Sequence, residues 1–169
     1  MVTPAVVGVT AMAAQRLAEL VHARRNEAAL RARGAVEAGA EHYPLVVALH
    51  VAWLASTLVE GRRARRPAPL PVAVLVAGQA LRYWAITSLG PRWTTRILVE
   101  PGAPLVSSGP YRWLRHPNYV AVVAEIAALP LVFRARRTAV VFSVLDAAVL
   151  AMRIRVEDRA LRAGAAPAA

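Results

Sequence analysis

The chain of 169 residues is 57% hydrophobic and 18% charged, with a mean hydropathy of +0.43 and a formal net charge of +11. Soluble domains are about 45–50% apolar and about 25% charged, so this composition excludes an ordinary soluble globule and is far too apolar for a disordered chain. All 21 basic residues are arginine, and the lack of cysteine excludes disulfides, thiolate metal sites and a cysteine nucleophile. The composition indicates a small membrane protein with basic loops, whose charge is explained by the lipid bilayer without a nucleic-acid partner.

Five apolar segments are candidates for membrane-spanning helices, since a span needs about 20 apolar residues. They cover residues 2–20, 43–60, 70–90, 118–133 and 138–152. The last two are short and are joined by residues 134–137, which predicts a tight helical hairpin or, alternatively, a re-entrant hairpin. We therefore expect an all-α, polytopic membrane fold with about five transmembrane helices and a C-terminal helical hairpin.

Five spans place the longer connecting segments on one side of the bilayer. These are residues 21–42, 91–117 and 153–169, which carry twelve arginines, whereas the short loops on the other side carry seven. The positive-inside rule then places the longer segments in the cytoplasm, which for a bacterial chain means the inner face of the inner membrane. We treat residues 1–169 as one domain with N-terminal helices on the substrate side (1–77), a cofactor-binding core (78–161) and a frayed tail (162–169).

The densest group of polar and aromatic residues precedes the fourth span, at residues 107–119. Gly109 and Pro110 predict a turn, and Pro117 suits the first turn of a helix. Arg115 and His116 then lie at a helix N-terminus, which favours an anionic ligand group. Alternatively, the arginines of this segment are interfacial anchors beside aromatic residues.

A second polar segment, residues 153–161, follows the fifth span and is expected to form an interfacial helix. Its adjacent acids, Glu157 and Asp158, are suited to accept hydrogen bonds from ribose hydroxyls or an ammonium group. The alternative is that they pair with neighbouring arginines on the helix surface.

Two carboxyl groups, those of Glu125 and Asp146, fall inside predicted spans, where ionisable residues are costly and are usually functional or paired. They are expected to face each other across the hairpin or to pair with Arg82. The four histidines have no close ligand spacing, so no metal site is expected.

The motif from Gly109 to Tyr119, read as Gly-Pro-Tyr-Arg and then Arg-His-Pro-Asn-Tyr, resembles the signature of the isoprenylcysteine carboxyl methyltransferase family. That family belongs with the membrane phospholipid methyltransferases, and the resemblance covers residues 78–161, with Glu157 and Asp158 where the family has paired acids. The N-terminal half resembles a bacterial subset, associated with type III polyketide synthases, that methylates alkylpyrones or alkylresorcinols on oxygen.

The resemblance implies S-adenosyl-L-methionine as the cofactor, a multi-helix membrane fold and a lipid-like small-molecule acceptor. Carried over position by position, the cofactor-binding residues are Gly109, Pro110, Tyr111, Arg115, His116, Pro117, Tyr119, Glu157 and Asp158. We expect methyl transfer to an enol, phenol or carboxylate oxygen. The alternatives are isoprenylcysteine carboxyl methylation, phospholipid N-methylation and a non-enzymatic membrane scaffold, and the sequence leaves the oligomeric state open.

A phenol acceptor benefits from a general base, and an anionic head group from a cation. The candidate bases are His42, His50 and Glu19, and the candidate substrate-binding residues are Arg16, Arg25, Trp53 and Trp84. The alternative for each is interfacial anchoring or ordinary helix packing.

Overall fold

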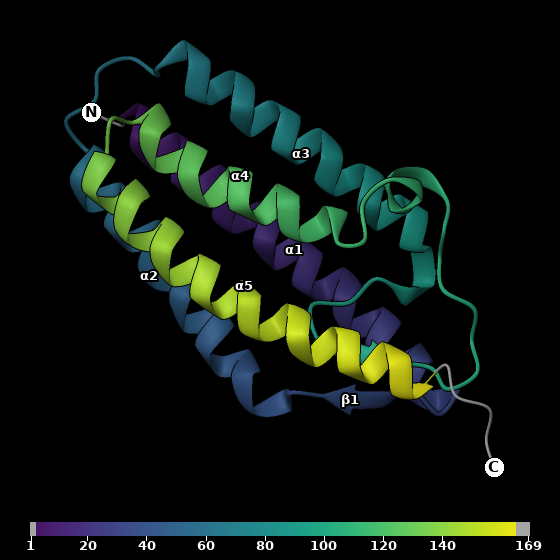
Figure 1. Ribbon diagram of the computed structural model, residues 1–169. Coiled ribbons are helices and arrows are strands. Elements are labelled where there is room, and N and C mark those ends of the chain that lie inside the picture. The colour runs from purple at the N-terminus through teal and green to yellow at the C-terminus, as the bar shows by residue number, and fades with distance from the viewer. Residues whose placement is uncertain (1–2, 165–169) are drawn as a thin grey trace.

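The computed structural model describes residues 3–164, which form a bundle of five long helices lying lengthwise beside one another (Figure 1). The helices are α1 (Pro4–Ala32), α2 (Tyr43–Gly61), α3 (Pro69–Leu89), α4 (Pro117–Val132) and α5 (Arg136–Gly164). Each predicted span overlaps one helix almost completely, although spans 70–90 and 118–133 each run one residue past the helix end and span 2–20 begins before α1; α4 and α5 form the expected hairpin. The first and last helices are longer than expected. Helix α1 continues to Ala32, and α5 includes the segment 153–161.

Shorter elements collect at the end of the bundle opposite the α4–α5 turn (Figure 1). They are three 3₁₀ turns, η1 (Ala40–His42), η2 (Gly90–Arg92) and η3 (Gly109–Arg112), and two strands, β1 (Val36–Ala38) and β2 (Ile97–Val99). The strands pair antiparallel, with Val36 opposite Val99. The all-α expectation is wrong in this detail, because two extended segments held side by side satisfy their backbone groups by pairing.

The tail prediction is partly corrected. Residues 162–164 continue α5 as helix, and the hydrogen bond from the Gly102 amide to the Gly164 carbonyl, 2.9 Å, ties this end to the loop after β2. The rest of the tail, residues 165–169, lies outside the described residues.

Prolines set several helix boundaries. A proline occupies the first turn of α1, α2, α3 and α4, where a missing N–H costs no helical hydrogen bond. Pro130 instead lies inside α4, which ends two residues later, and its ring leaves the Ile126 carbonyl without a helical donor. The indole Nε1 of Trp53, on α2, donates to that oxygen at 3.1 Å, so α2 completes the hydrogen bonding of α4.

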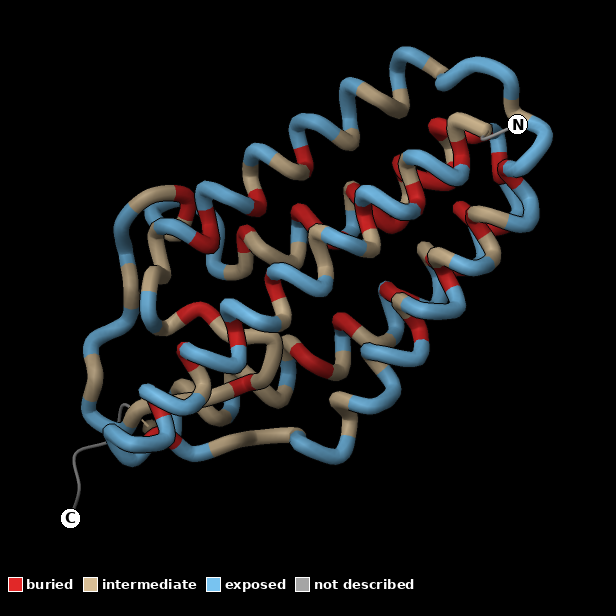
Figure 2. Tube along the Cα trace, turned by 180° about the vertical axis from the view of Figure 1, so that it is seen from behind, coloured by how far each residue is buried: buried red, intermediate tan, exposed pale blue. Residues whose placement is uncertain are grey.

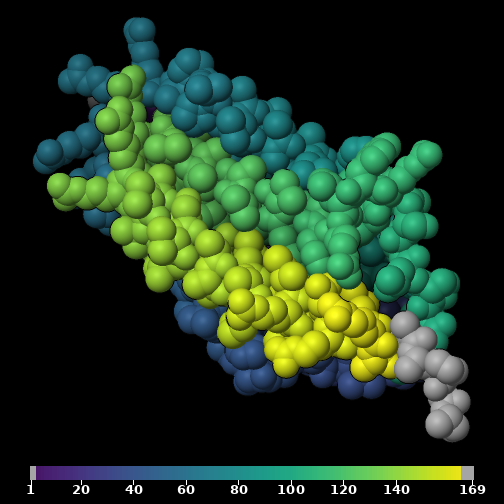
Figure 3. All heavy atoms as spheres, viewed as in Figure 1, coloured from purple at the N-terminus to yellow at the C-terminus, as the bar shows by residue number. Residues whose placement is uncertain are grey.

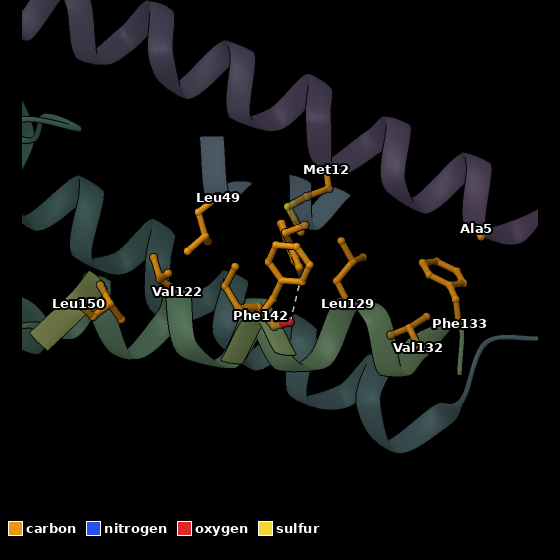
Figure 4. Close-up of a cluster of buried hydrophobic side chains, with 11 residues drawn as sticks. Ala5, Met12, Leu49, Val122, Leu129, Val132, Phe133, Phe142 and Leu150 are labelled. Atoms are coloured by element: carbon orange, nitrogen blue, oxygen red, sulfur yellow. Dashed lines mark hydrogen bonds between the residues drawn. The ribbon is translucent and has the colours of Figure 1, made fainter. Parts of the chain in front are cut away.

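The core runs along the bundle axis, where side chains such as Leu49, Val122, Leu129 and Phe142 pack together (Figure 4). The outward faces of the helices stay exposed although they are rich in valine and leucine (Figure 2). Two stretches, Ala40–Gly61 and Pro69–Arg92, are long and apolar enough to cross a membrane, yet only 22% and 17% of their most apolar windows are buried. A core helix of a soluble protein is mostly buried, so these outward apolar faces fit contact with lipid.

Candidate functional site

One cavity of about 710 Å³ extends from the 3₁₀ turn η3 into the middle of the bundle. All five helices and the segment 92–107 contribute side chains to its wall. The last turns of α5 pack against the segments that precede α4, at the end of the molecule that carries the loops (Figure 3). The cavity therefore joins the motif before α4 to polar residues in the middle of the bundle.

The first turn of α4 and the last turns of α5 are linked by polar contacts. The Tyr119 hydroxyl donates to Oε2 of Glu157 at 2.6 Å, and Nε2 of His116 donates to Oδ1 of Asp158 at 3.2 Å. The other ring nitrogen, Nδ1, lies 3.7 Å from the Glu157 carboxylate, and the His116 ring stacks on Tyr119 with centroids 5.4 Å apart. Because the hairpin is antiparallel, residues about 40 positions apart in sequence form one polar cluster, which we call the motif cluster.

The turn η3 fixes the approach of the chain to this cluster. Gly109 has φ of +58°, and a Cβ placed there would overlap the Ser88 side chain of α3, so only glycine fits. The turn brings Tyr111 to the cavity wall. Burial and the nearby Glu157 carboxylate both raise the pKa of Tyr111, so its phenol remains a proton donor at neutral pH.

Two features of the motif cluster indicate a place for a polar ligand. Asn118 lines the cavity, and its buried Oδ1 has no hydrogen-bond donor within residues 3–164. The Arg115 side chain is 77% exposed and lies 3.5 Å from Asp158, so its guanidinium is available for an anion. The cluster thus offers carboxylates for hydroxyl or ammonium donors and a guanidinium for a carboxylate.

A second polar group, the buried cluster, lies deeper and consists of Arg16, Glu19, Arg82 and Glu125. Arg82 binds both oxygens of Glu19, at 2.9 and 2.7 Å, and Arg16 binds Glu19 at 2.6 Å and also contacts Glu125. Its two positive and two negative side chains come from α1, α3 and α4. The cluster is balanced in charge, which offsets the cost of placing it inside an apolar bundle.

His50 is another polar side chain on the cavity wall. Its Nδ1 lies 2.9 Å from the Val46 carbonyl, which accepts but cannot donate a hydrogen bond. Nδ1 therefore carries the proton in the neutral ring, and Nε2 keeps its lone pair.

The comparisons with known proteins agree with this geometry. The model of the isoprenylcysteine carboxyl methyltransferase family matches residues 71–163, a range that includes the motif cluster. The chain belongs to this family. It is a membrane methyltransferase family, and the two apolar helices agree with membrane character.

Two bacterial relatives match along most of their length. The uncharacterized protein YpbQ of Bacillus subtilis is 42% identical over 152 residues, which cover 88% of this chain and 90% of YpbQ. An uncharacterized protein of Haemophilus influenzae is 29% identical over 142 residues, which cover 81% of this chain and 83% of the relative. No solved structure matches the chain.

The structure of this family member brings together the residues predicted to bind the cofactor. Pro110 and Pro117 are buried supports that begin η3 and α4, and Gly109 permits the turn. The side chains of Tyr111, Arg115, His116, Tyr119, Glu157 and Asp158 all line the cavity. Their role in binding a cofactor stays a prediction.

The residues predicted on the substrate side are dispersed. Glu19, Arg16 and His50 line the cavity, although Arg82 already occupies both oxygens of Glu19. The other four, His42, Arg25, Trp53 and Trp84, are not part of the cavity wall.

The four residues that do not line the cavity lie elsewhere for identifiable structural reasons. His42 precedes α2 and Arg25 is exposed on α1. The indole of Trp53 serves the Ile126 carbonyl in the core, and Trp84 packs on Trp113 with ring centroids 5.7 Å apart.

Two cavity residues, Asn118 and Arg153, received no role from the sequence, although Asn118 lies inside the motif. Of the two acids expected to pair with Arg82 or face each other, Glu125 lies 3.7 Å from Arg82, whereas Asp146 has no ion pair within residues 3–164. Arg153 donates from α5 to the Thr95 carbonyl at 3.0 Å, a contact that depends on the tertiary fold. Within residues 3–164, no group of three or more metal-ligating side chains is placed to hold an ion.

Proposed function

We propose that this protein transfers a methyl group from S-adenosyl-L-methionine to an oxygen atom of a lipid-like acceptor. The observation that carries the proposal is the continuous cavity that joins the motif cluster to the middle of an apolar bundle. A polar cofactor bound at one end would then meet an amphiphilic acceptor whose tail stays between the helices. Such an acceptor need not leave the bilayer.

The residues of the motif cluster fit the cofactor. The carboxylates of Glu157 and Asp158 suit ribose hydroxyls or the ammonium group, and Arg115 with the N-terminus of α4 suits the carboxylate. The buried Oδ1 of Asn118 offers a further acceptor that the protein leaves unused within the described residues. When bound, the cofactor supplies an electrophilic methyl group on a sulfonium ion, and the protein contributes alignment and exclusion of water.

For the acceptor we propose an alkylpyrone or alkylresorcinol type of polyketide, following the resemblance of the N-terminal half. His50 is one candidate base for such an acceptor, because its Nε2 lone pair lies on the cavity wall. The family name supports a second candidate, the carboxyl group of an isoprenylcysteine. The proposed site faces the cytoplasm of a bacterial inner membrane, since the longer arginine-bearing segments lie at that end.

The test measures methyl transfer by the purified, detergent-solubilised protein from radiolabelled cofactor to an alkylresorcinol, an alkylpyrone and a farnesylcysteine analogue in parallel. We expect the first two to be methylated on oxygen and to be preferred over the third. Replacing His116 with Ala or Glu157 with Gln should raise the cofactor dissociation constant at least about tenfold, because each removes a charge-assisted hydrogen bond.

The matched control is Glu41→Gln, which changes an exposed carboxylate outside the cavity. Transfer only to farnesylcysteine, or only to the amine of a phospholipid, would replace the proposed acceptor with that one. Unchanged cofactor affinity in both His116→Ala and Glu157→Gln would refute the proposed cofactor site.

A further inference from the structure

Asp146 places a carboxyl group on the cavity wall. It lies in the middle of α5, and its side chain is 3% exposed overall. Within residues 3–164 its oxygens have no protein hydrogen-bond partner, and they face the cavity and are not fully enclosed by protein atoms. An unpaired carboxyl in an apolar bundle is costly, so its presence on a cavity wall points to a ligand.

The charged group that acts most directly on Asp146 is the carboxylate of Glu125, which belongs to the buried cluster. The buried cluster holds Arg16 and Arg82 against Glu19 and Glu125, which leaves no net charge. Arg153, two turns along α5 from Asp146, donates to the Thr95 carbonyl. Asp146 therefore does not serve as the counter-ion of these arginines.

Asp146 lies deeper in the bundle than the motif cluster, toward the turn between α4 and α5. At the far end, Glu60 of α2 accepts hydrogen bonds from the backbone and side chain of Thr138 on α5. From that contact, His50 lies about 15 Å along α2 and Asp146 about 12 Å along the antiparallel α5, at 1.5 Å per residue. Both side chains thus line the cavity at a similar depth.

The same face of α5 connects Asp146 to the motif cluster. Asp146, Leu150, Arg153 and Glu157 follow one another at spacings of four, three and four, and all line the cavity. Asp146 and Glu157 are separated by about 16 Å along the helix axis. That separation leaves room for the cofactor near Glu157 and for the head group of an acceptor near Asp146.

We propose that Asp146 accepts the proton of a phenolic hydroxyl during methyl transfer, so that the substrate is a neutral phenol of the alkylresorcinol type and not an oxygen that is already ionised. This inference rests on the proposed methyltransferase function. As the acceptor oxygen bonds to the methyl carbon, the carbon–sulfur bond breaks and its electron pair stays on sulfur. The hydroxyl proton passes to the Asp146 carboxylate, which leaves a methyl ether, a thioether and a neutral carboxyl group.

The chemistry of the two acceptor classes supports this choice. A carboxylate acceptor is already anionic, needs no base and would bring a second negative charge beside Asp146. A phenol donates a hydrogen bond to the carboxylate and needs its proton removed. Transfer of that proton also neutralises a charge whose burial is unfavourable.

The test compares the wild type with Asp146→Asn, which keeps the shape and breaks no ion pair. Each protein is assayed with an alkylresorcinol, whose hydroxyls are neutral at the assay pH, and with a nitro-substituted alkylresorcinol that is ionised there. We expect Asp146→Asn to lower kcat about 100-fold or more with the neutral acceptor and less than about tenfold with the ionised one. The cofactor dissociation constant should be unchanged.

The matched control is Thr57→Val, which removes a buried hydroxyl that lies outside the cavity and has no hydrogen-bond partner among the described residues. It should leave both rates unchanged. If Asp146→Asn does not fold, Asp146→Ser is judged by the same two-acceptor criterion.

The outcomes separate the two proposals. A wild type that binds the cofactor but methylates neither resorcinol overturns the proposed acceptor, whatever Asp146 does. If the wild type is active and Asp146→Asn has the same kcat, the proposed role of Asp146 is overturned. An equal fall in kcat with the neutral and the ionised acceptor overturns it too. If His50→Gln lowers kcat selectively with the neutral acceptor and Asp146→Asn does not, His50 accepts the proton. That result also overturns the proposed role of Asp146.

Discussion

The motif cluster and the buried cluster use similar side chains in opposite ways. In the motif cluster, His116, Tyr119, Glu157 and Asp158 contact one another while each stays partly accessible on the cavity wall. In the buried cluster, one carboxylate, that of Glu19, receives hydrogen bonds from two arginines and a glutamine. The first arrangement leaves hydrogen-bonding capacity for a ligand, whereas the second saturates the Glu19 carboxylate with protein donors. Within residues 3–164, Nε of Arg16, Nη1 of Arg82 and Oε1 of Glu125 are nevertheless buried without a hydrogen-bond partner.

This difference shows that ion pairing, and not the presence of charge, separates a binding site from a structural one inside an apolar bundle. A paired charge lowers the cost of its own burial and holds helices together. The cost of burying an unpaired or partly accessible charged group is offset only if a ligand pairs with the group or a proton neutralises it. We therefore expect substitutions in the buried cluster to act on stability, and substitutions in the motif cluster to act on cofactor binding.

The largest expected effect is the loss of Arg82. Arg82→Gln removes the two hydrogen bonds to Glu19 and the nearby charge for Glu125, and should lower the free energy of unfolding by about 3–5 kcal/mol. The measurement is reversible unfolding in detergent micelles with increasing denaturant. Arg25→Gln, on the exposed face of α1, is the matched control and should change it by less than about 0.5 kcal/mol.

A double variant sharpens the same comparison. Arg82→Leu with Glu19→Leu leaves Arg16 paired with Glu125, and should recover most of the lost stability because no buried charge is left alone. Glu157→Gln, in contrast, should change stability by less than about 1 kcal/mol while it weakens cofactor binding. Equal losses of stability in Arg82→Gln and Glu157→Gln would remove the distinction between the two clusters.

The next effect concerns the turn that carries the motif cluster. Gly109→Ala forces a left-handed backbone on alanine and places its Cβ 2.9 Å from Cβ of Ser88, so it should cost about 2–4 kcal/mol. Gly102→Ala is the matched control, because Gly102 has φ of +74° but a Cβ added there would meet no atom within 4 Å, and it should cost only about 1 kcal/mol. Thermal unfolding of both variants measures the difference, and equal costs would show that the contact with α3 is unimportant.

The sequence predicted most of the fold because its signals are local. Apolar stretches and prolines in first turns place the five helices, and the position of Pro117 correctly predicts the start of α4. The sheet between β1 and β2 was missed, since three-residue strands carry no periodic pattern and depend on two distant loops meeting.

The convergence of the motif residues on one cavity was predictable in part, while their role stays a prediction. The motif residues lie close together in sequence before α4, and the hairpin brings the paired acids of α5 to them. The substrate side depends on side-chain direction around each helix, which residue type alone does not fix. Thus the Trp53 indole serves the Ile126 carbonyl, which Pro130 left without its helical donor, and Asp146 faces the cavity instead of pairing with Arg82.

The smallest effect is expected from an ion-pair group at the loop end, where solvent weakens charge interactions. Burial alone raises the pKa of Glu37, but hydrogen bonds from Arg96 and Arg31 outweigh it and lower that pKa below the ordinary 4.5. The stabilisation is therefore complete at neutral pH and is lost as the pH falls below 4.5 through the lowered pKa of the folded state. Since both arginines are partly exposed, Glu37→Gln should lower the free energy of unfolding by only about 0.5–1 kcal/mol at pH 7. The unfolding free energies of wild type and variant should become equal in acid. A loss as large as that of Arg82→Gln, or one independent of pH, would contradict the view that buried ion pairs contribute more to stability than exposed ones.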